Sequence, residues 1–244
     1  MMTNTNKKTL AIFSLTCCEG CQFAILRHYE KFSSLLNFFE IDNFRLTQED
    51  NEPGPYDVAI VEGTPESKKE IDHLRMIRKQ SDVLIALGSC AHLGGIQSER
   101  NRLPEKFIRK PDVKTIADVV NVDYVLPGCP VNHDEVFKCL MDIYWGKVFK
   151  LPDYSVCFEC RQNENECLLK QGKACLGPVT RGGCNSICVN SGEMCFGCRG
   201  AIDQANFEKM IEILEPIIDE REIENLLSIF GEYQKEWKGR NNGK

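Results

Sequence analysis

The stretch TLAIFSLTCCEGCQ (residues 9–22) joins an apolar run to three closely spaced cysteines. The run LAIFSL (residues 10–15) has the pattern of a strand that is buried on both faces. Cys17, Cys18 and Cys21 follow it at once, just before a segment with helical periodicity. A strand that passes through a turn into a helix is the repeating unit of parallel α/β sheets, so this stretch indicates that architecture.

The same alternation continues through the first 150 residues. Further runs with the pattern of buried strands are YDVAIVEG (56–63), DVLIALG (82–88) and VDYVLPG (122–128), and EIDNFRL (40–46) is a weaker candidate. Helical patterns lie between them, at residues 22–39, 66–80 and 133–145. Strands that alternate with helices of this length predict a doubly wound parallel sheet.

Cysteines follow several of these predicted strands. Cys18 and Cys21 come after the first, Cys90 in GSCAHLGG after DVLIALG, and Cys129 in PGCPVN after the last. Glu62 ends another strand, and we expect it to face the same crevice, because ligands bind beyond the carboxyl ends of the strands in such sheets. Four convergent thiolates can hold zinc or a 4Fe-4S cube. One local pair plus two remote single cysteines favours the cube, since structural zinc usually uses two local pairs.

Composition narrows the function classes. The 244 residues carry 30 basic and 36 acidic side chains, and this net charge of -6 is unlike the basic footprint of a nucleic-acid binder. No segment approaches the about 20 apolar residues of a membrane span, and the first residues show no export signal. We therefore expect a cytoplasmic protein. Its 14 cysteines then indicate metal or redox chemistry, because disulfides are rare in a reducing compartment.

Eight of the cysteines crowd into a second group after LPDYS (151–155), a plausible linker. They are Cys157, Cys160, Cys167, Cys175, Cys184, Cys188, Cys195 and Cys198. Two C-x-x-C pairs flank four further cysteines, a total that divides naturally into two cubes. Zinc ribbons are the alternative, but the gaps do not repeat the usual two-pair spacing. A loop-rich segment with so few apolar side chains needs inorganic groups to hold its shape.

These motifs together resemble the small subunits of nickel-iron hydrogenases, especially the delta subunits of cytoplasmic sulfhydrogenase-type enzymes, which are relatives of the complex I 20 kDa subunit. The resemblance implies an α/β, flavodoxin-like doubly wound parallel sheet, a small cysteine-rich iron-sulfur domain and C-terminal helices. It also implies that the proximal cluster is held by Cys18, Cys21, Cys90 and Cys129.

The resemblance further implies how the eight later cysteines divide between two more 4Fe-4S clusters. The distal cluster would take Cys157, Cys160, Cys167 and Cys175, and the medial cluster Cys184, Cys188, Cys195 and Cys198. The spacing is also compatible with an interleaved division, in which a cysteine of one run binds the other cube. The predicted parts are residues 1–150 for the sheet domain, 151–200 for the cysteine-rich domain and 201–244 for a helical cap and tail.

The function implied is electron transfer inside a hydrogenase complex. The catalytic nickel-iron site would lie on a partner large subunit, with no catalytic residue in this chain. No nucleotide or flavin motif follows any strand, so a further flavin or iron-sulfur subunit would carry electrons onward. Two other classes stay open: an iron-sulfur subunit of a complex-I-like oxidoreductase without hydrogenase activity, and a zinc-stabilised interaction module.

Other cysteine, glutamate and histidine residues of the sheet domain are not expected to bind a cluster. Cys17 is expected to be a spare neighbour of the proximal cluster, and Cys139 to be part of the core. Glu62 is expected near that cluster and not as a ligand. His92 and His133 could tune the cluster through hydrogen bonds.

Two further patterns concern helices. Asn132 with Glu135 fits a helix-capping pattern in NHDE (residues 132–135). The apolar residues from Phe207 to Ile218 predict a helix, and residues 221–234 predict a second one. We expect these helices to cap the cysteine-rich domain, and docking of a partner subunit on their apolar face is the alternative.

Overall fold

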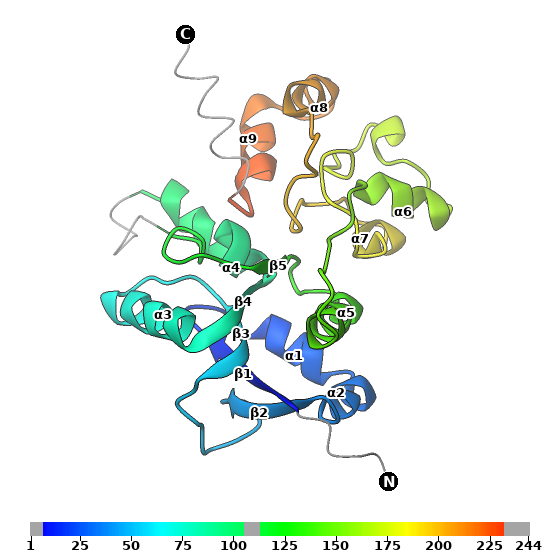
Figure 1. The fold of residues 1–244 in the computed structure, drawn as a ribbon. Coiled ribbons are helices and arrows are strands. Elements are labelled where there is room, and N and C mark those ends of the chain that lie inside the picture. Colours follow the sequence, from blue (N-terminus) through cyan, green and yellow to red (C-terminus); the bar gives the residue numbers. More distant parts are fainter. Residues whose placement is uncertain (1–6, 105–112, 232–244) are drawn as a thin grey trace.

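The computed structural model describes residues 7–104 and 113–231. Five strands form one fully parallel sheet in the order β2-β1-β3-β4-β5 (Figure 1). Their bounds are β1 (Lys8–Ser14), β2 (Phe39–Phe44), β3 (Tyr56–Glu62), β4 (Ser81–Leu87) and β5 (Tyr124–Leu126). This is the flavodoxin-like strand order, so the predicted fold class is confirmed, including the weak strand at 40–46.

Helices cover both faces of the sheet (Figure 1). On one face lie α1 (Gly20–Leu26), α2 (Tyr29–Leu35) and α5 (His133–Tyr144), and on the other α3 (Lys68–Gln80) and α4 (Gly88–Leu93), which leads into the 3-10 helix η1 (Gly95–Arg102). Strand alternation explains this division. In β1, Leu10 and Ile12 face one set of helices, whereas Ala11 and Phe13 face the other.

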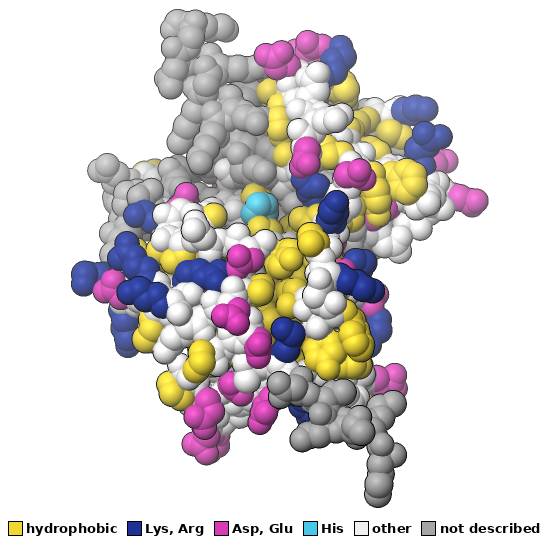
Figure 2. All heavy atoms as spheres, viewed as in Figure 1, with side chains coloured by type: hydrophobic (Ala, Val, Ile, Leu, Met, Phe, Trp, Pro, Cys, Tyr) yellow, Lys and Arg dark blue, Asp and Glu magenta, His cyan; other side chains and the backbone are white. Residues whose placement is uncertain are grey.

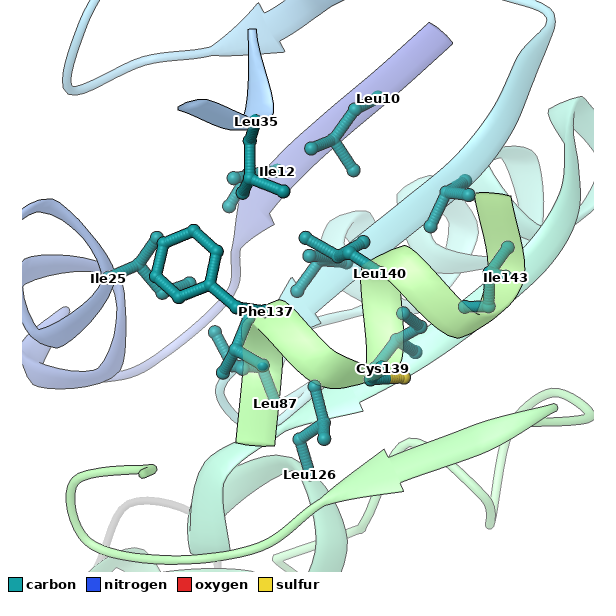
Figure 3. Packing of buried hydrophobic residues seen from close by; sticks show 14 of the residues in the cluster. Leu10, Ile12, Ile25, Leu35, Leu87, Leu126, Phe137, Cys139, Leu140 and Ile143 are labelled. Carbon is teal, nitrogen blue, oxygen red and sulfur yellow. The ribbon is translucent and has the colours of Figure 1, made fainter. Parts of the chain in front are cut away.

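The larger core lies under α5. Phe137 and Leu140 of that helix pack over Leu10 and Ile12 of β1 (Figure 3). Cys139 is fully buried in the same cluster, which confirms its predicted place in the core.

The segment 22–39, predicted as a single helix, is two short helices. The first, α1, ends at Leu26, and α2 begins only at Tyr29 after His28 leaves helical geometry. Ile25 and Leu35 nevertheless reach the same core cluster. The apolar periodicity therefore continues across the break, which is why the pattern did not reveal it.

The last strand is shorter than the apolar run at residues 122–128 predicted. β5 covers only three residues and stops before Pro127, which has no backbone N–H to donate to the ladder.

After the sheet domain, the chain forms mostly turns and short helices. They are α6 (Val156–Gln162), the 3-10 helix η3 (Leu169–Gln171), α7 (Ile187–Asn190), α8 (Phe207–Leu214) and α9 (Glu220–Ser228). The two predicted C-terminal helices are present, although residues 232–234 of the second prediction lie outside the described residues. Both pack on Leu176 and Val179 of the cysteine-rich segment.

On the face drawn in Figure 2, apolar side chains gather in patches between charged residues of both signs. Within the residues that the structure describes, no helix is long and apolar enough to cross a membrane.

Candidate metal centres

The carboxyl ends of β1, β3, β4 and β5 meet at one edge, where the sequence predicts the first site. Cys18 and Cys21 follow β1, Cys90 lies in α4 directly after β4, and Cys129 follows β5. The strand register brings the ends of β1, β3 and β4 side by side, because Glu62 at the end of β3 pairs with both Ser14 of β1 and Leu87 of β4.

Close backbone contacts bring the three cysteine loops together. The Ser89 N–H donates to the Gly128 carbonyl at 2.9 Å, which joins the Cys90 loop to the Cys129 loop. Gly88 has φ +83°, and a Cβ placed on it would lie 2.5 Å from the Cys21 sulfur. Only glycine therefore allows the β4 loop to approach the C-x-x-C turn so closely.

Electrostatics show that the four thiols are neighbours. The pKa of the Cys90 thiol is raised to about 11, mainly by burial and also by the adjacent Cys129 and Cys18. Burial also raises the pKa of Cys129, with Cys18 again contributing. Burial is the largest cause of the raised Cys21 pKa, and Cys129 adds to it. Such a group resists ionisation by itself, whereas bound iron cations would stabilise its thiolates, so the donor set fits a metal cluster.

Glu62 reaches this edge but is already engaged by the backbone of α1. Its carboxylate is 2% exposed and accepts from the N–H of Cys21 at 3.1 Å and the N–H of Gln22 at 3.3 Å. The Gln22 side-chain amide donates a third bond at 3.0 Å. No side chain of the preceding residue caps α1. Glu62 therefore holds the start of the helix that carries Cys21.

Cys17 lies in the same neighbourhood. The pKa of its thiol is raised to about 12, mainly by burial and also by Glu62, Cys18 and Cys90. Its predicted role as a spare beside the cluster stays a prediction, because its thiol interacts with those of Cys18 and Cys90, two of the proposed ligands.

The first four cysteines of the later segment form a second group. Cys157 and Cys160 lie one helical turn apart on α6, a helix that the loop-like composition did not predict. The pKa of Cys157 is raised to about 11, mainly by burial and also by the thiols of Cys175, Cys160 and Cys167. The same two partners, Cys175 and Cys167, raise the pKa of Cys160 after burial.

The remaining four cysteines line a cavity of about 1060 Å³ between the cysteine-rich segment and the sheet domain. Cys184, Cys188, Cys195 and Cys198 border it, together with Cys129 from the first site. The pKa of Cys198 is raised to about 12, mainly by burial and also by Cys184, Cys129 and Cys188.

Cys175 lies between the second and third groups. It contributes to the raised pKa of Cys157 and also to that of Cys188, in each case after burial. Its sulfur accepts from the Cys195 N–H at 3.4 Å. The division of the eight cysteines between two clusters therefore stays a prediction. In an interleaved arrangement, Cys175 would bind the cluster of the third group.

Among the described residues, no three His, Cys, Asp or Glu side chains converge as ligands of a single metal ion do. A four-iron cube makes a different demand, because each of its thiolates binds a different iron atom.

The two histidines singled out in the sequence lie in different places, and His133 lines the cavity of the third group. His92 lies in α4, where burial and the Arg181 charge lower its pKa to about 4. His133 stacks on His28 with ring centroids 3.4 Å apart. Whether either tunes a cluster stays a prediction.

The capping pattern in NHDE is half right. Asn132 caps α5 by accepting from the Asp134 N–H at 3.0 Å. Glu135, however, does not reach back to the cap. It pairs instead with Arg199, 64 residues later.

Sequence reasoning missed that three charged side chains near the sites are buried: Glu135, Glu159 and Arg199. Glu159 lies inside the C-x-x-C pair of α6 and accepts from the N–H groups of Gly183 at 2.6 Å and Ser186 at 3.1 Å. It thus ties the second cysteine group to the loop of Cys184. Its place between two cysteines was the only signal, and none marked Arg199.

Solved structures show which fold this chain shares. The chain matches an actinobacterial-type NiFe hydrogenase from Ralstonia eutropha over 98% of its length and 91% of that chain, with a TM-score of 0.63 and 15% identity. It also matches an NAD+-reducing NiFe hydrogenase in the H2-reduced state, with a TM-score of 0.55 and 25% identity over 60% of this chain and 96% of that one. The fold is that of hydrogenase small subunits.

Sequence comparison identifies the family. The model described as NADH ubiquinone oxidoreductase, 20 Kd subunit, matches residues 18–143. Sulfhydrogenase 2 subunit delta of Pyrococcus furiosus is 40% identical over 235 residues, which cover 92% of this chain and 99% of that protein. The chain belongs to this family and is a NiFe hydrogenase small subunit of the sulfhydrogenase delta type, as the resemblance predicted.

Proposed function

We propose that this chain relays electrons through three 4Fe-4S clusters between the nickel-iron site of a large subunit and a further flavin or iron-sulfur subunit, in the cytoplasm. The observation that carries the proposal is the gathering of twelve cysteines into three groups, one at the sheet edge and two in the later segment. Residues 1–150 would carry the proximal cluster, residues 151–200 the medial and distal clusters, and residues 201–244 a helical cap.

The proposed ligands follow the three groups. Cys18, Cys21, Cys90 and Cys129 would hold the proximal cluster, Cys184, Cys188, Cys195 and Cys198 the medial one, and Cys157, Cys160, Cys167 and Cys175 the distal one. When bound, such clusters accept and release single electrons, and the protein tunes them by hydrogen bonds and burial. Cys129 also lines the cavity bordered by the four proposed medial ligands, which supports transfer of electrons from the proximal cluster to the medial one.

Metal analysis of the anaerobically purified complex tests the cluster number. We expect about twelve irons and as much sulfide in this chain, because each cube has four irons. A zinc-containing protein without sulfide would contradict the proposal.

Replacement of one ligand tests the assignment. Cys129→Ser should remove or convert the proximal cluster and leave the medial and distal clusters loaded, because its sulfur belongs to the sheet edge. A variant that keeps all of the iron and an unchanged EPR spectrum would refute the role of Cys129.

The large subunit should cover the proximal site, because electrons cross quickly only between neighbouring metal sites. The loops at 16–22, 88–96 and 127–133 surround that site. Phe23 is 57% exposed and Ile187 63% exposed, and both line the adjoining cavity. Exposed apolar side chains at a cavity rim are typical of interfaces. Hydrogen exchange in these loops should slow when the complex forms, and unchanged exchange would count against this interface.

The distal cluster should govern where electrons leave. Cys157→Ser should impair reduction of the carrier but preserve hydrogen-deuterium exchange at the nickel site, which needs no electron export. The two activities are compared in the assembled complex. Carrier reduction at the wild-type rate with the distal cluster absent would show another exit route.

A further inference from the structure

Arg199 has the largest fully buried side chain in the part of the chain that the structure describes, and it is 1% exposed. A buried charge is costly unless its hydrogen-bonding groups find partners. Its guanidinium donates from Nε to the Gly182 carbonyl at 2.7 Å and from one terminal nitrogen to the Pro127 carbonyl at 2.8 Å. The other terminal nitrogen pairs with both carboxylate oxygens of Glu135, at 2.8 and 3.0 Å.

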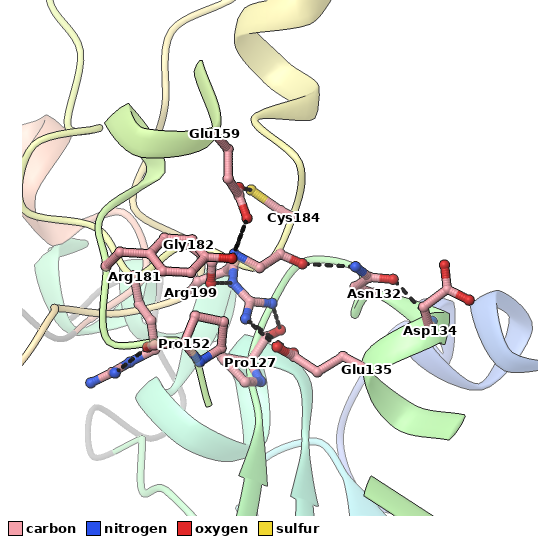
Figure 4. A network of polar contacts seen from close by, with 12 residues as sticks. Pro127, Asn132, Asp134, Glu135, Pro152, Glu159, Arg181, Gly182, Cys184 and Arg199 are labelled. Atoms are coloured by element: carbon pink, nitrogen blue, oxygen red, sulfur yellow. Dashed lines mark hydrogen bonds and ion pairs between the residues drawn. The ribbon is translucent and has the colours of Figure 1, made fainter. Parts of the chain in front are cut away.

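These partners come from two different parts of the molecule (Figure 4). Pro127 begins the loop that carries Cys129, and Glu135 lies in the first turn of α5, whereas Gly182 belongs to the cysteine-rich segment. Asn132 adds a parallel link, because its side-chain amide donates to the Gly183 carbonyl at 2.7 Å. The Arg199 side chain therefore fastens the cysteine-rich segment to the loop that holds a proximal ligand.

The residue before Arg199 is the medial ligand Cys198, and it touches two proximal-site loops. The Ser89 hydroxyl donates to the Cys198 carbonyl. The backbone of Cys129 lies close enough to the Cys198 sulfur to lower the pKa of that thiol, and both cysteines line the same cavity. A proposed ligand of the medial cluster and one of the proximal cluster are thus neighbours, next to the buried guanidinium.

Space around this contact is tightly limited. Gly183 has φ +110°, and a Cβ placed on it would lie 2.8 Å from a Glu135 carboxylate oxygen and would overlap the guanidinium. The chain therefore adopts a backbone conformation that favours glycine in order to admit the Arg199 side chain.

We propose that Arg199 is a positioning residue that holds Cys198 against Cys129 and thereby sets the electronic coupling between the medial and proximal clusters. The inference rests on the proposed function, since it needs both clusters. Transfer between the two sites moves one electron: the proximal site is oxidised, the medial site is reduced, and no bond of the chain forms or breaks. Arg199 also follows the medial sulfur's residue directly, so its place affects which backbone groups face that sulfur, and such groups tune the potential of a cluster.

Arg199→Lys tests this role in the assembled hydrogenase complex. Lysine keeps the positive charge but cannot reproduce the planar fork that reaches Glu135, Pro127 and Gly182 together. The matched control is Arg181→Lys, because Arg181 is also largely buried and donates to the Pro152 and Ala201 carbonyls at 2.7 and 3.2 Å. Glu135→Gln is a second variant, which keeps the side-chain volume and removes the ion pair.

The readouts are iron content, the reduction potential of the medial cluster, and the EPR splitting from the magnetic interaction of the reduced proximal and medial clusters. Arg199→Lys should keep the iron, weaken the splitting, shift the medial potential and slow H2-driven carrier reduction. Hydrogen-deuterium exchange at the nickel site should be unchanged. Glu135→Gln should change the splitting, the medial potential and the rate of carrier reduction in the same direction by a smaller amount. Arg181→Lys should match the wild type in all three.

Two results would overturn the positioning role. One is wild-type splitting and potential in an Arg199→Lys complex with full iron. The other is loss of the medial irons in both Arg199→Lys and Glu135→Gln, which would mean that the ion pair assembles the site and does not set its coupling. Failure of the proposed function looks different: the wild-type complex itself would have fewer than about eight irons in this chain or no magnetic interaction.

Discussion

The sheet domain and the cysteine-rich segment hold their thiols by different physical means. In the sheet domain, parallel strands and an apolar core hold the loops of Cys21, Cys90 and Cys129 in place. In the cysteine-rich segment, the helices α6 and α7 have seven and four residues, and the thiols of Cys175 and Cys195 are themselves part of the small core. The first region has an apolar core that extends far beyond its cysteines, whereas the second has cysteines as a main part of its small core.

Removal of iron should separate the two regions most strongly. Under anaerobic chelation, we expect amide protection to collapse in residues 156–198, because metal binding there supplies folding free energy. Strands β1, β3 and β4 should keep their protection, since their core contains no proposed ligand except Cys21. Hydrogen exchange with mass spectrometry measures both. Equal loss in the two regions would show that the sheet domain also depends on its cluster.

Gly88→Ala should damage the proximal site while leaving the sheet folded. The added methyl would meet the Cys21 sulfur, and the positive φ adds strain. We expect loss of about four irons, the content of one cube. Gly146→Ala is the matched control: its φ is +67°, and a Cβ there meets nothing within 4 Å. Full iron in Gly88→Ala would mean that the loop can move without cost to the site.

Glu62→Gln should loosen the helix that carries Cys21. A glutamine offers one acceptor oxygen where the carboxylate uses two, so at least one buried N–H loses its partner. The cost should be about 1–3 kcal/mol in the opening free energy of α1 amides. The control Glu30→Gln, at an exposed position of α2, should change it by less than about 0.5 kcal/mol. Equal exchange rates in the two variants would show that the Glu62 bonds do not hold α1.

Cys17→Ser should have the smallest effect. If Cys17 is a spare beside the cluster, the variant keeps its iron and at most shifts the cluster potential. Cys21→Ser, four residues later, should lose about four irons. The reverse outcome would assign the tandem pair Cys17 and Cys18 as the ligands. Iron content and EPR of both variants decide between these arrangements.

The sequence by itself determined the sheet and the edge at which the first four thiols lie. Short apolar runs such as YDVAIVEG are local patterns, and parallel connectivity then forces their carboxyl ends onto one side. Cysteine order carried the resemblance to hydrogenase small subunits because metal ligands tolerate little change in type. The break at His28 escaped detection, since two short helices that pack on one core preserve a single apolar period.

Only the tertiary structure decided which charges are buried and which residues they join. Glu135 follows a helix-capping residue and Arg199 follows a C-x-x-C pair, and nothing in either local pattern points to the other. Their pairing across 64 residues depends on how the cysteine-rich segment docks on the Pro127 loop. From the sequence alone, a charged side chain is expected to be exposed to solvent, because burial of an ion is costly. It becomes favourable here only when carbonyl and carboxylate partners from distant segments converge on it.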